Sequence, residues 1–150
     1  MSWNEEEYDK FVAELEGKYP EMFANPYGGI AVGPGWWPII RSLCAQIDGH
    51  IKWKNRTREA LLKDNPYNHP IPEEVPQVVV MQIKEKFGGL RFYYDGGDDF
   101  IRGLETMAEV WASMSCEECG KPGERRSGGW IRTLCDEHEA ERQERLKEHN

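Results

Sequence analysis

Four potential metal ligands in the last third of the chain follow the pattern C-x2-C-x15-C-x2-H, and this spacing constrains the fold more than any other feature. They are Cys116, Cys119, Cys135 and His138. A two-residue gap lets both side chains of a pair point at one ion, and two such pairs supply the four ligands of a closed tetrahedral zinc site. Because protein fills every coordination position, the spacing predicts one structural Zn²⁺ rather than a catalytic one.

Two other interpretations of these residues are weaker. They are four unrelated side chains, or a disulfide beside a bystander histidine. Two pairs at this separation disfavour the first, and a reducing cytosol disfavours the second. The remaining cysteine, Cys44, falls on an apolar helical stripe, which predicts a core residue rather than a nucleophile.

The N-terminal segment is predicted to be helical. Apolar side chains recur at helical spacing over residues 3–17, with Ser2 as the expected N-cap and Glu5 completing a capping box. Residues 20–35 contain NPYGG and GPG, so we expect a loop there.

A second helix is expected from near Trp36, with Gly49 as the place where it breaks or bends. Four prolines then exclude a helix from residues 64–76. We interpret that segment as an excursion from the body of the protein.

The central segment has the clearest strand pattern. Residues 77–95 alternate apolar and polar side chains around Gly88-Gly89, which predicts a β-hairpin with one apolar face. The predicted face comprises Val79, Met81, Ile83, Phe87, Leu90, Phe92 and Tyr94. A helix should follow over residues 99–114, and its predicted buried stripe is Leu104, Met107, Ala108, Trp111 and Met114.

These elements predict an α+β fold: a β-hairpin or small antiparallel sheet flanked by helices, with a zinc finger at the C-terminal end. We expect residues 1–113 to form this body, and residues 114–150 to form a zinc-binding module that ends in a polar helix. The string ERRSGGWIRTL between the ligand pairs is typical of a hairpin. A knuckle, a hairpin and a helix whose first turn supplies the second ligand pair resemble the treble-clef zinc finger.

Three strings resemble a family of small uncharacterised proteins encoded by bacteriophages and bacterial genomes. They are GWWPII, IKEKFGGLRFYY and CEECGKPGERRSGGWIRTLCDEH, of which KFGGLRFY and GGWxRTLCDEH are the specific parts. The match covers roughly residues 35–60 and 78–140. The resemblance implies a cytosolic protein of a phage-infected or prophage-carrying bacterium, and it implies no particular activity.

Charge and hydropathy disfavour two classes of partner, nucleic acids bound non-specifically and membranes. The formal net charge of −8 repels phosphate backbones at long range and disfavours non-specific nucleic-acid binding. No stretch has the roughly 18 apolar residues of a membrane span, and the acidic N-terminus lacks an apolar signal region. We therefore expect a cytoplasmic protein, in the host cell if it is phage-encoded, with no membrane partner.

The sequence disfavours an enzyme. Nucleases with His-Asn-His signatures on a treble-clef fold need histidines in the hairpin, whereas residues 120–134 contain neither histidine nor asparagine. Asp95, Asp98 and Asp99 are expected to form a polar turn and a helix cap rather than a cation site. The chain has no serine elbow, phosphate loop or dinucleotide fingerprint.

Two predicted hairpins combine basic and aromatic side chains, which suits phosphate contacts with base stacking. The candidates are Lys84, Lys86, Arg91 and Tyr93 in residues 84–93, with Arg125, Arg126, Trp130 and Arg132 in residues 121–132. Alternatively, these cations pair with the abundant acids. Trp36 and Trp37 are candidate anchors of a protein interface, unless they belong to the core.

The favoured hypothesis is a non-enzymatic zinc protein that binds a host or phage protein, such as a defence or processing factor. The alternative is a zinc protein that binds nucleic acid through both hairpins.

Overall fold

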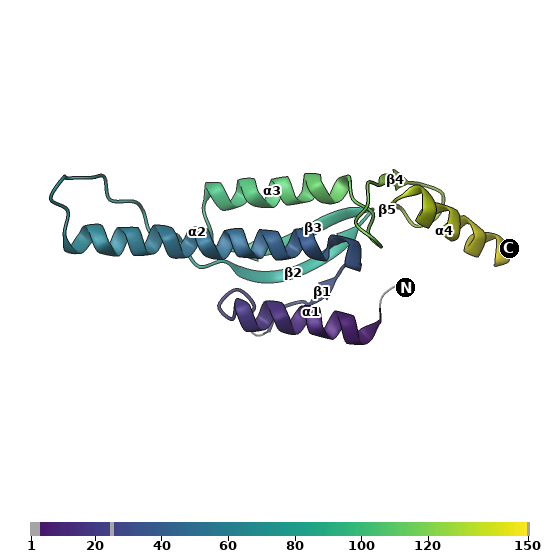
Figure 1. Ribbon diagram of the computed structural model, residues 1–150, viewed down its shortest axis with the longest axis horizontal. Helices are drawn as coiled ribbons and strands as arrows, with labels where there is room; N and C mark the ends of the chain where they lie inside the picture. Colours follow the sequence, from purple (N-terminus) through teal and green to yellow (C-terminus); the bar gives the residue numbers. More distant parts are fainter. Residues whose placement is uncertain (1–3, 25, 150) are drawn as a thin grey trace.

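The computed structural model describes residues 4–24 and 26–149, whose elements make an α+β fold (Figure 1). The helices are α1 (Glu5–Lys18), the 3-10 turn η1 (Pro34–Trp36), α2 (Trp37–Lys63), α3 (Asp99–Ser113) and α4 (Asp136–Glu148). The strands are β1 (Ile30–Ala31), β2 (Val79–Lys86), β3 (Gly89–Asp95), β4 (Glu124–Arg126) and β5 (Arg132–Leu134). The predicted fold class is confirmed: helices flank a small sheet, and the C-terminal region is zinc-finger-like.

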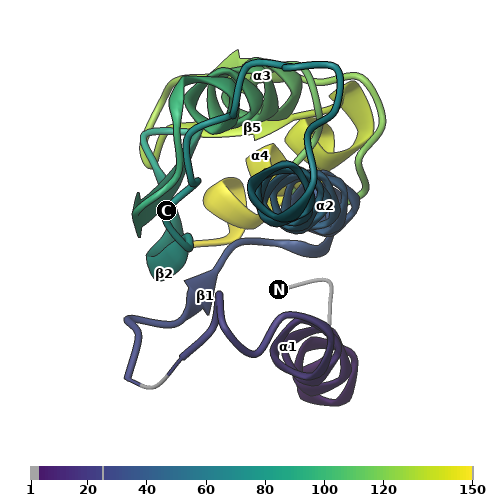
Figure 2. The same cartoon turned by 90° about the vertical axis from the view of Figure 1, so that its left-hand side faces the viewer.

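The body is built around α2. The larger sheet has the order β1-β2-β3, with β1 parallel and β3 antiparallel to β2. Helices α1 and α3 lie on opposite sides of α2, and α2 extends well past the sheet (Figures 1 and 2). Phe11 of α1 stacks on Trp37 of α2, with ring centroids 4.7 Å apart, so α1 joins the same core as the sheet.

The start of α1 is fixed by a side-chain cap. The Asn4 side-chain oxygen accepts a hydrogen bond from the Glu7 backbone N–H at 2.8 Å, which makes Asn4 the N-cap. The predicted cap, Ser2, lies outside the described residues. The predicted loop over 20–35 contains the strand β1, which is too short to show any alternation in the sequence.

Helix α2 continues through Gly49 for 27 residues, so the expectation of a break at this glycine is wrong. The proline-rich segment 64–76 contains no helix or strand, as predicted. It folds back on α2, where the Asn55 side chain hydrogen-bonds both backbone polar groups of Val75 at 2.8 and 3.1 Å.

The β2–β3 hairpin forms as predicted, but its apolar face differs because of a bulge. The register shifts between Val80 and Gln82, so Met81 is an extra residue in β2. The extra residue changes the phase of the alternation. Val80 and Ile83 are buried, whereas Met81 is exposed at the bulge. Phe87 is exposed for a different reason, because it lies in the turn with a φ of +54°. The predicted face was therefore wrong at Met81 and Phe87.

Helix α3 is rotated relative to the predicted orientation. Its core side is formed by Ile101, Ala108 and Ala112, with Leu104 partly buried. Three residues of the predicted buried stripe, Met107, Trp111 and Met114, are exposed instead. Ile101 and the two alanines face the body, where α3 packs against α2 and β3.

Helix α4 is polar on nearly every side, as predicted, and its buried residue is Arg142. Among the described helices, none combines the length and apolar character needed to cross a membrane.

Candidate metal centre

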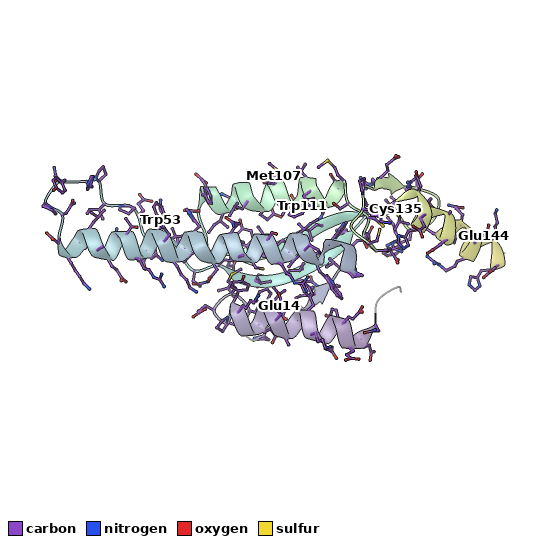
Figure 3. All side chains as sticks on the ribbon, viewed as in Figure 1. Glu14, Trp53, Met107, Trp111, Cys135 and Glu144 are labelled. Atoms are coloured by element: carbon purple, nitrogen blue, oxygen red, sulfur yellow. The ribbon has the colours of Figure 1, made fainter. Side chains whose placement is uncertain are left out.

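The four predicted ligands come together where α4 begins, at the position that Figure 3 marks with Cys135. Three sulfurs and one imidazole nitrogen lie within 4.8 Å of one another. Cys119 Sγ is 3.8 Å from Cys135 Sγ, and His138 Nδ1 is 3.5 Å from Cys116 Sγ and 3.2 Å from Cys135 Sγ. The cluster can hold a single metal ion.

These separations are close to the edges of a tetrahedron around one ion. Metal–sulfur bonds of about 2.3 Å and a metal–nitrogen bond of about 2.0 Å place two sulfurs about 3.8 Å apart and a sulfur and a nitrogen about 3.5 Å apart. The donor set therefore fits zinc in geometry. A disulfide would bring two sulfurs to about 2.05 Å, and all four cysteines are free thiols.

A tight turn and a helix start position the two ligand pairs. In the first pair, Gly120 donates its N–H to Cys116 O at 2.9 Å, with a φ of +79° that favours glycine. In the second pair, Cys135 is the N-cap of α4, and its sulfur accepts a hydrogen bond from the His138 N–H. The β4–β5 hairpin joins the two pairs.

The thiols differ in acidity. Burial opposes the Cys135 thiolate, but hydrogen bonds from the His138 backbone and ring outweigh burial and lower the pKa of Cys135 to about 7. Burial raises the pKa of Cys119 to about 11, against a hydrogen bond from the backbone of Lys121. Burial also raises the pKa of Cys44 to about 12, and Cys44 is fully buried, which confirms it as a core residue.

The body supports the first ligand pair through a very close backbone approach. Gly35 donates its N–H to Glu117 O at 2.9 Å, and Trp36 donates Nε1–H to Ser115 O at 2.9 Å. A Cβ on Gly35 would lie 2.0 Å from Cys116 O, so only glycine fits there. Sequence reasoning assigned the GPG string that ends at Gly35 to a loop; its close glycine spacing was the available signal of a backbone contact.

A second support involves Thr133 of β5. Its hydroxyl donates to Gly88 O in the turn of the first hairpin at 2.7 Å, and its N–H donates to Glu117 Oε2 at 2.6 Å. Burial raises the pKa of Glu117 to about 7, while the Thr133 N–H and Arg132 act in the opposite direction. Sequence reasoning missed Glu117 because nothing in a C-x2-C motif distinguishes an acid that supports the fold from any other residue between the two cysteines.

A cleft of about 900 Å³ lies between the body and the C-terminal module. The body contributes Tyr8, residues 30–34 and Glu85; the module contributes Glu117, Glu118, Trp130, Arg132, Glu141 and Arg145. The Trp130 side chain donates Nε1–H to Glu85 Oε1 at 3.4 Å, yet Trp130 is 74% exposed. The cleft thus combines an accessible indole with four carboxylates and two arginines.

The predicted interaction residues have different environments in the structure: some are buried in the core, some are ion-paired within the C-terminal module, and some lie at the surface. Trp36 and Trp37 are 0% and 7% exposed, so they are core residues and the prediction of surface anchors was wrong. The turn η1 places both indoles inward, where Trp37 also donates to Val32 O. Arg126 and Arg132 form ion pairs with carboxylates of their own module.

On the first basic hairpin Lys86 and Tyr93 are exposed, and Lys84 and Arg91 are partly exposed. Lys84 is paired with Arg91 in the strand register and lies 5.7 Å from the centre of the Tyr93 ring. Arg125 is exposed on β4. Their role in binding stays a prediction.

No known protein family, curated protein or solved structure matches this chain. The resemblance drawn from the sequence strings therefore stays a prediction. The fold and the cluster define an α+β protein with one Cys3His site able to hold a metal ion.

We predict opposite effects for the same substitution at two glycines. Gly35→Ala should destabilise the protein by about 2–4 kcal/mol, because the new methyl group overlaps the Cys116 carbonyl. Gly49→Ala should stabilise it by about 0.5–1 kcal/mol, because a Cβ at this helical position meets open space. Urea unfolding measures both changes, and equal stability of the two variants would contradict the packing described.

Proposed function

We propose that the chain holds one structural zinc ion and acts by binding another protein, without catalysing a reaction. Three thiolates and an imidazole suit Zn²⁺, whereas Mg²⁺ and Ca²⁺ take oxygen ligands. The four side chains complete the coordination, which leaves no position for water or substrate. The module's own buried cluster is small, comprising Cys116, Leu134 and Cys135, so metal binding would supply much of its folding free energy.

The observation that carries the binding proposal is the cleft beside Trp130. Exposed tryptophans at the rim of a cleft are frequent hot spots of protein interfaces. Arg132 already pairs with Glu117 and Glu118, so Glu85 and Glu141 give the cleft an acidic character. Together with the net charge of −8, this favours a partner that presents a basic segment, with one cation over the indole face.

Zinc and the cleft are coupled in this proposal. Glu117 and Glu118 lie between the first two ligands and form part of the cleft wall. Loss of the ion would release that wall, so partner binding should require the metal. A host defence or processing factor is the favoured partner because the sequence strings resemble phage and bacterial proteins.

The metal site has a direct test. Protein purified under reducing conditions should contain one zinc per chain by elemental analysis, and Cys119→Ser should reduce that content. Cys44→Ala is the matched control, because this thiol lies in the core away from the cluster. A strong chelator should make the three ligand thiols reactive to a thiol reagent. Absence of zinc from the purified wild-type protein would refute the metal assignment.

The binding proposal predicts a specific effect of Trp130→Ala. A partner recovered from bacterial lysate on the wild-type chain should bind this variant at least about tenfold more weakly, because the anchor is removed. Tyr67→Ala is the matched control: Tyr67 is 83% exposed in the proline-rich segment, away from the cleft. Calorimetry on the purified pair measures the difference. If both variants bind like the wild type, the cleft is not the docking surface.

A second candidate function is nucleic-acid binding through the first hairpin. Lys84 and Arg91 face each other in the register, and the Arg91 guanidinium lies 3.9 Å from the Glu109 carboxylate of α3. A bound phosphate would supply a further anionic partner to this pair of cations. Tyr93 beside Lys84 offers a ring for base stacking. The acidic body opposes this function, so binding would depend on low salt.

Fluorescence anisotropy with a single-stranded oligonucleotide tests this second function. Affinity should fall steeply as salt rises, and Lys84→Glu should weaken binding by about tenfold or more because a phosphate contact is lost. Lys10→Glu on α1 makes the same charge change away from the hairpin and should have a much smaller effect. Anisotropy that does not change with protein concentration at low salt would refute nucleic-acid binding as a function.

A further inference from the structure

Helix α3 carries a second apolar face that neither the core nor the metal module covers. Its large side chains are between 43% and 66% exposed: Phe100, Met107, Val110, Trp111 and Met114. We call this set the α3 stripe. Figure 3 labels Met107 and Trp111 on α3, on the side of the molecule away from α1. At about 600 Å², this set is as large as the largest apolar patch of a typical monomer, and patches of that size are often functional.

The α3 stripe has the spacing of a helix–helix seam. Its positions are separated by alternating steps of three and four residues: Phe100, Gly103, Met107, Val110 and Met114. Trp111 widens the stripe on the side of the partly buried Leu104. The charged residues of α3 fall outside this series. The stripe itself can therefore meet another helix without burying a charge, and the charged residues near it, Lys54, Asp98 and Asp99, line the groove at its N-terminal end.

The N-terminal end of the stripe opens into a hollow. A groove of about 740 Å³ lies between α2 and the start of α3, with Ala45, Gly49, Trp53 and Phe100 among its lining residues. Phe100 is held by stacking on His50, with ring centroids 4.3 Å apart, and His50 is hydrogen-bonded to Asp98 at 2.8 Å. The C-terminal end of the stripe, in contrast, carries the exposed side chains of Trp111 and Met114.

We propose that the α3 stripe is the interface of a homodimer, in which a second copy packs its own α3 antiparallel about a two-fold axis at Met107. A two-fold axis makes each contact occur twice, so the surface must complement itself. In this register Gly103 faces Trp111 of the second copy, and Phe100 faces its Met114. A Cβ on Gly103 would meet no atom within 4 Å, which leaves open space for the indole.

The groove supplies the second half of the complementarity. Met114 of one copy arrives beside Phe100 and Trp53 of the other, where a thioether makes favourable contacts with aromatic rings. The C-terminal end of each stripe thus meets the groove at the N-terminal end of the other. This surface is separate from the cleft beside Trp130, so the dimer does not depend on the proposed function.

Area and charge set the expected strength of the dimer. Five large side chains that are about half exposed on each copy would bury on the order of 1,200 Å² in total, the lower end for specific interfaces. Each copy also carries a net charge of −8, so the two copies repel each other. We expect a dimer in the micromolar range that tightens as salt rises, because salt screens the repulsion.

Sedimentation equilibrium on the full zinc-loaded chain, over a range from about 1 μM to 1 mM, tests the proposal. The wild type should dimerise, and Met107→Glu should raise the dissociation constant at least about thirtyfold, because two carboxylates meet at the axis. Thr106→Glu is the matched control: it adds the same charge to the neighbouring exposed position and should change the constant much less.

A cross-link tests the register independently. Met107→Cys should give a covalent dimer under mild oxidation, because the axis brings the two introduced sulfurs together, whereas Thr106→Cys and the wild type should not. A chain that stays monomeric throughout the concentration range overturns the proposal. So does a dimer that Met107→Glu leaves unchanged, and so does capture of a different protein by the stripe of a monomeric chain.

Discussion

The close approach of Gly35 to the Cys116 carbonyl is the contact on which the rest of the architecture depends. It lets η1 lie directly against the turn that carries the first two ligands, and it brings Trp36 within hydrogen-bonding distance of Ser115, 79 residues later in the chain. The metal cluster is local to the module, yet its position relative to the body is set by this distant segment. The cleft exists because the module is held at this position beside β1 and β2.

Charge is distributed unevenly between the surfaces of the protein. Within the module, Arg126 and Arg132 form ion pairs with nearby carboxylates. These two cations therefore add little positive charge to the surface of the module. Glu85 and Glu141 remain at the cleft. On the outer side of the first hairpin Lys84 is adjacent to Arg91, and Arg91 pairs with Glu109 of α3 at 3.9 Å. The protein thus presents an acidic cleft and a small basic strand surface.

Helix α3 shows how the packing of one side decides the chemistry of the other. The body takes the side with Ala108 and Ala112, and the larger Met107 and Trp111 are left in solvent. Exposed apolar surface carries a free-energy cost in water, which a matching surface removes. The spacing of the α3 stripe and the groove at its N-terminal end fit a second helix with the same spacing, whose end side chains enter that groove.

The sequence by itself determined the features that depend on local spacing. The two ligand pairs, the hairpin around Gly88-Gly89, the break after Lys63 and the overall α+β class all follow from residues near one another in the chain. The apolar stripe of α2 also placed Cys44 correctly in the core, whereas only the tertiary structure decided the buried sides of β2 and α3 and the burial of two indoles. The bulge at Met81 changed the phase of β2, and the rotation of α3 exposed Met107, Trp111 and Met114. The turn η1 and the start of α2 placed Trp36 and Trp37 in the core. Each outcome depends on contacts with segments distant in sequence, and periodicity within one element carries no information about such contacts.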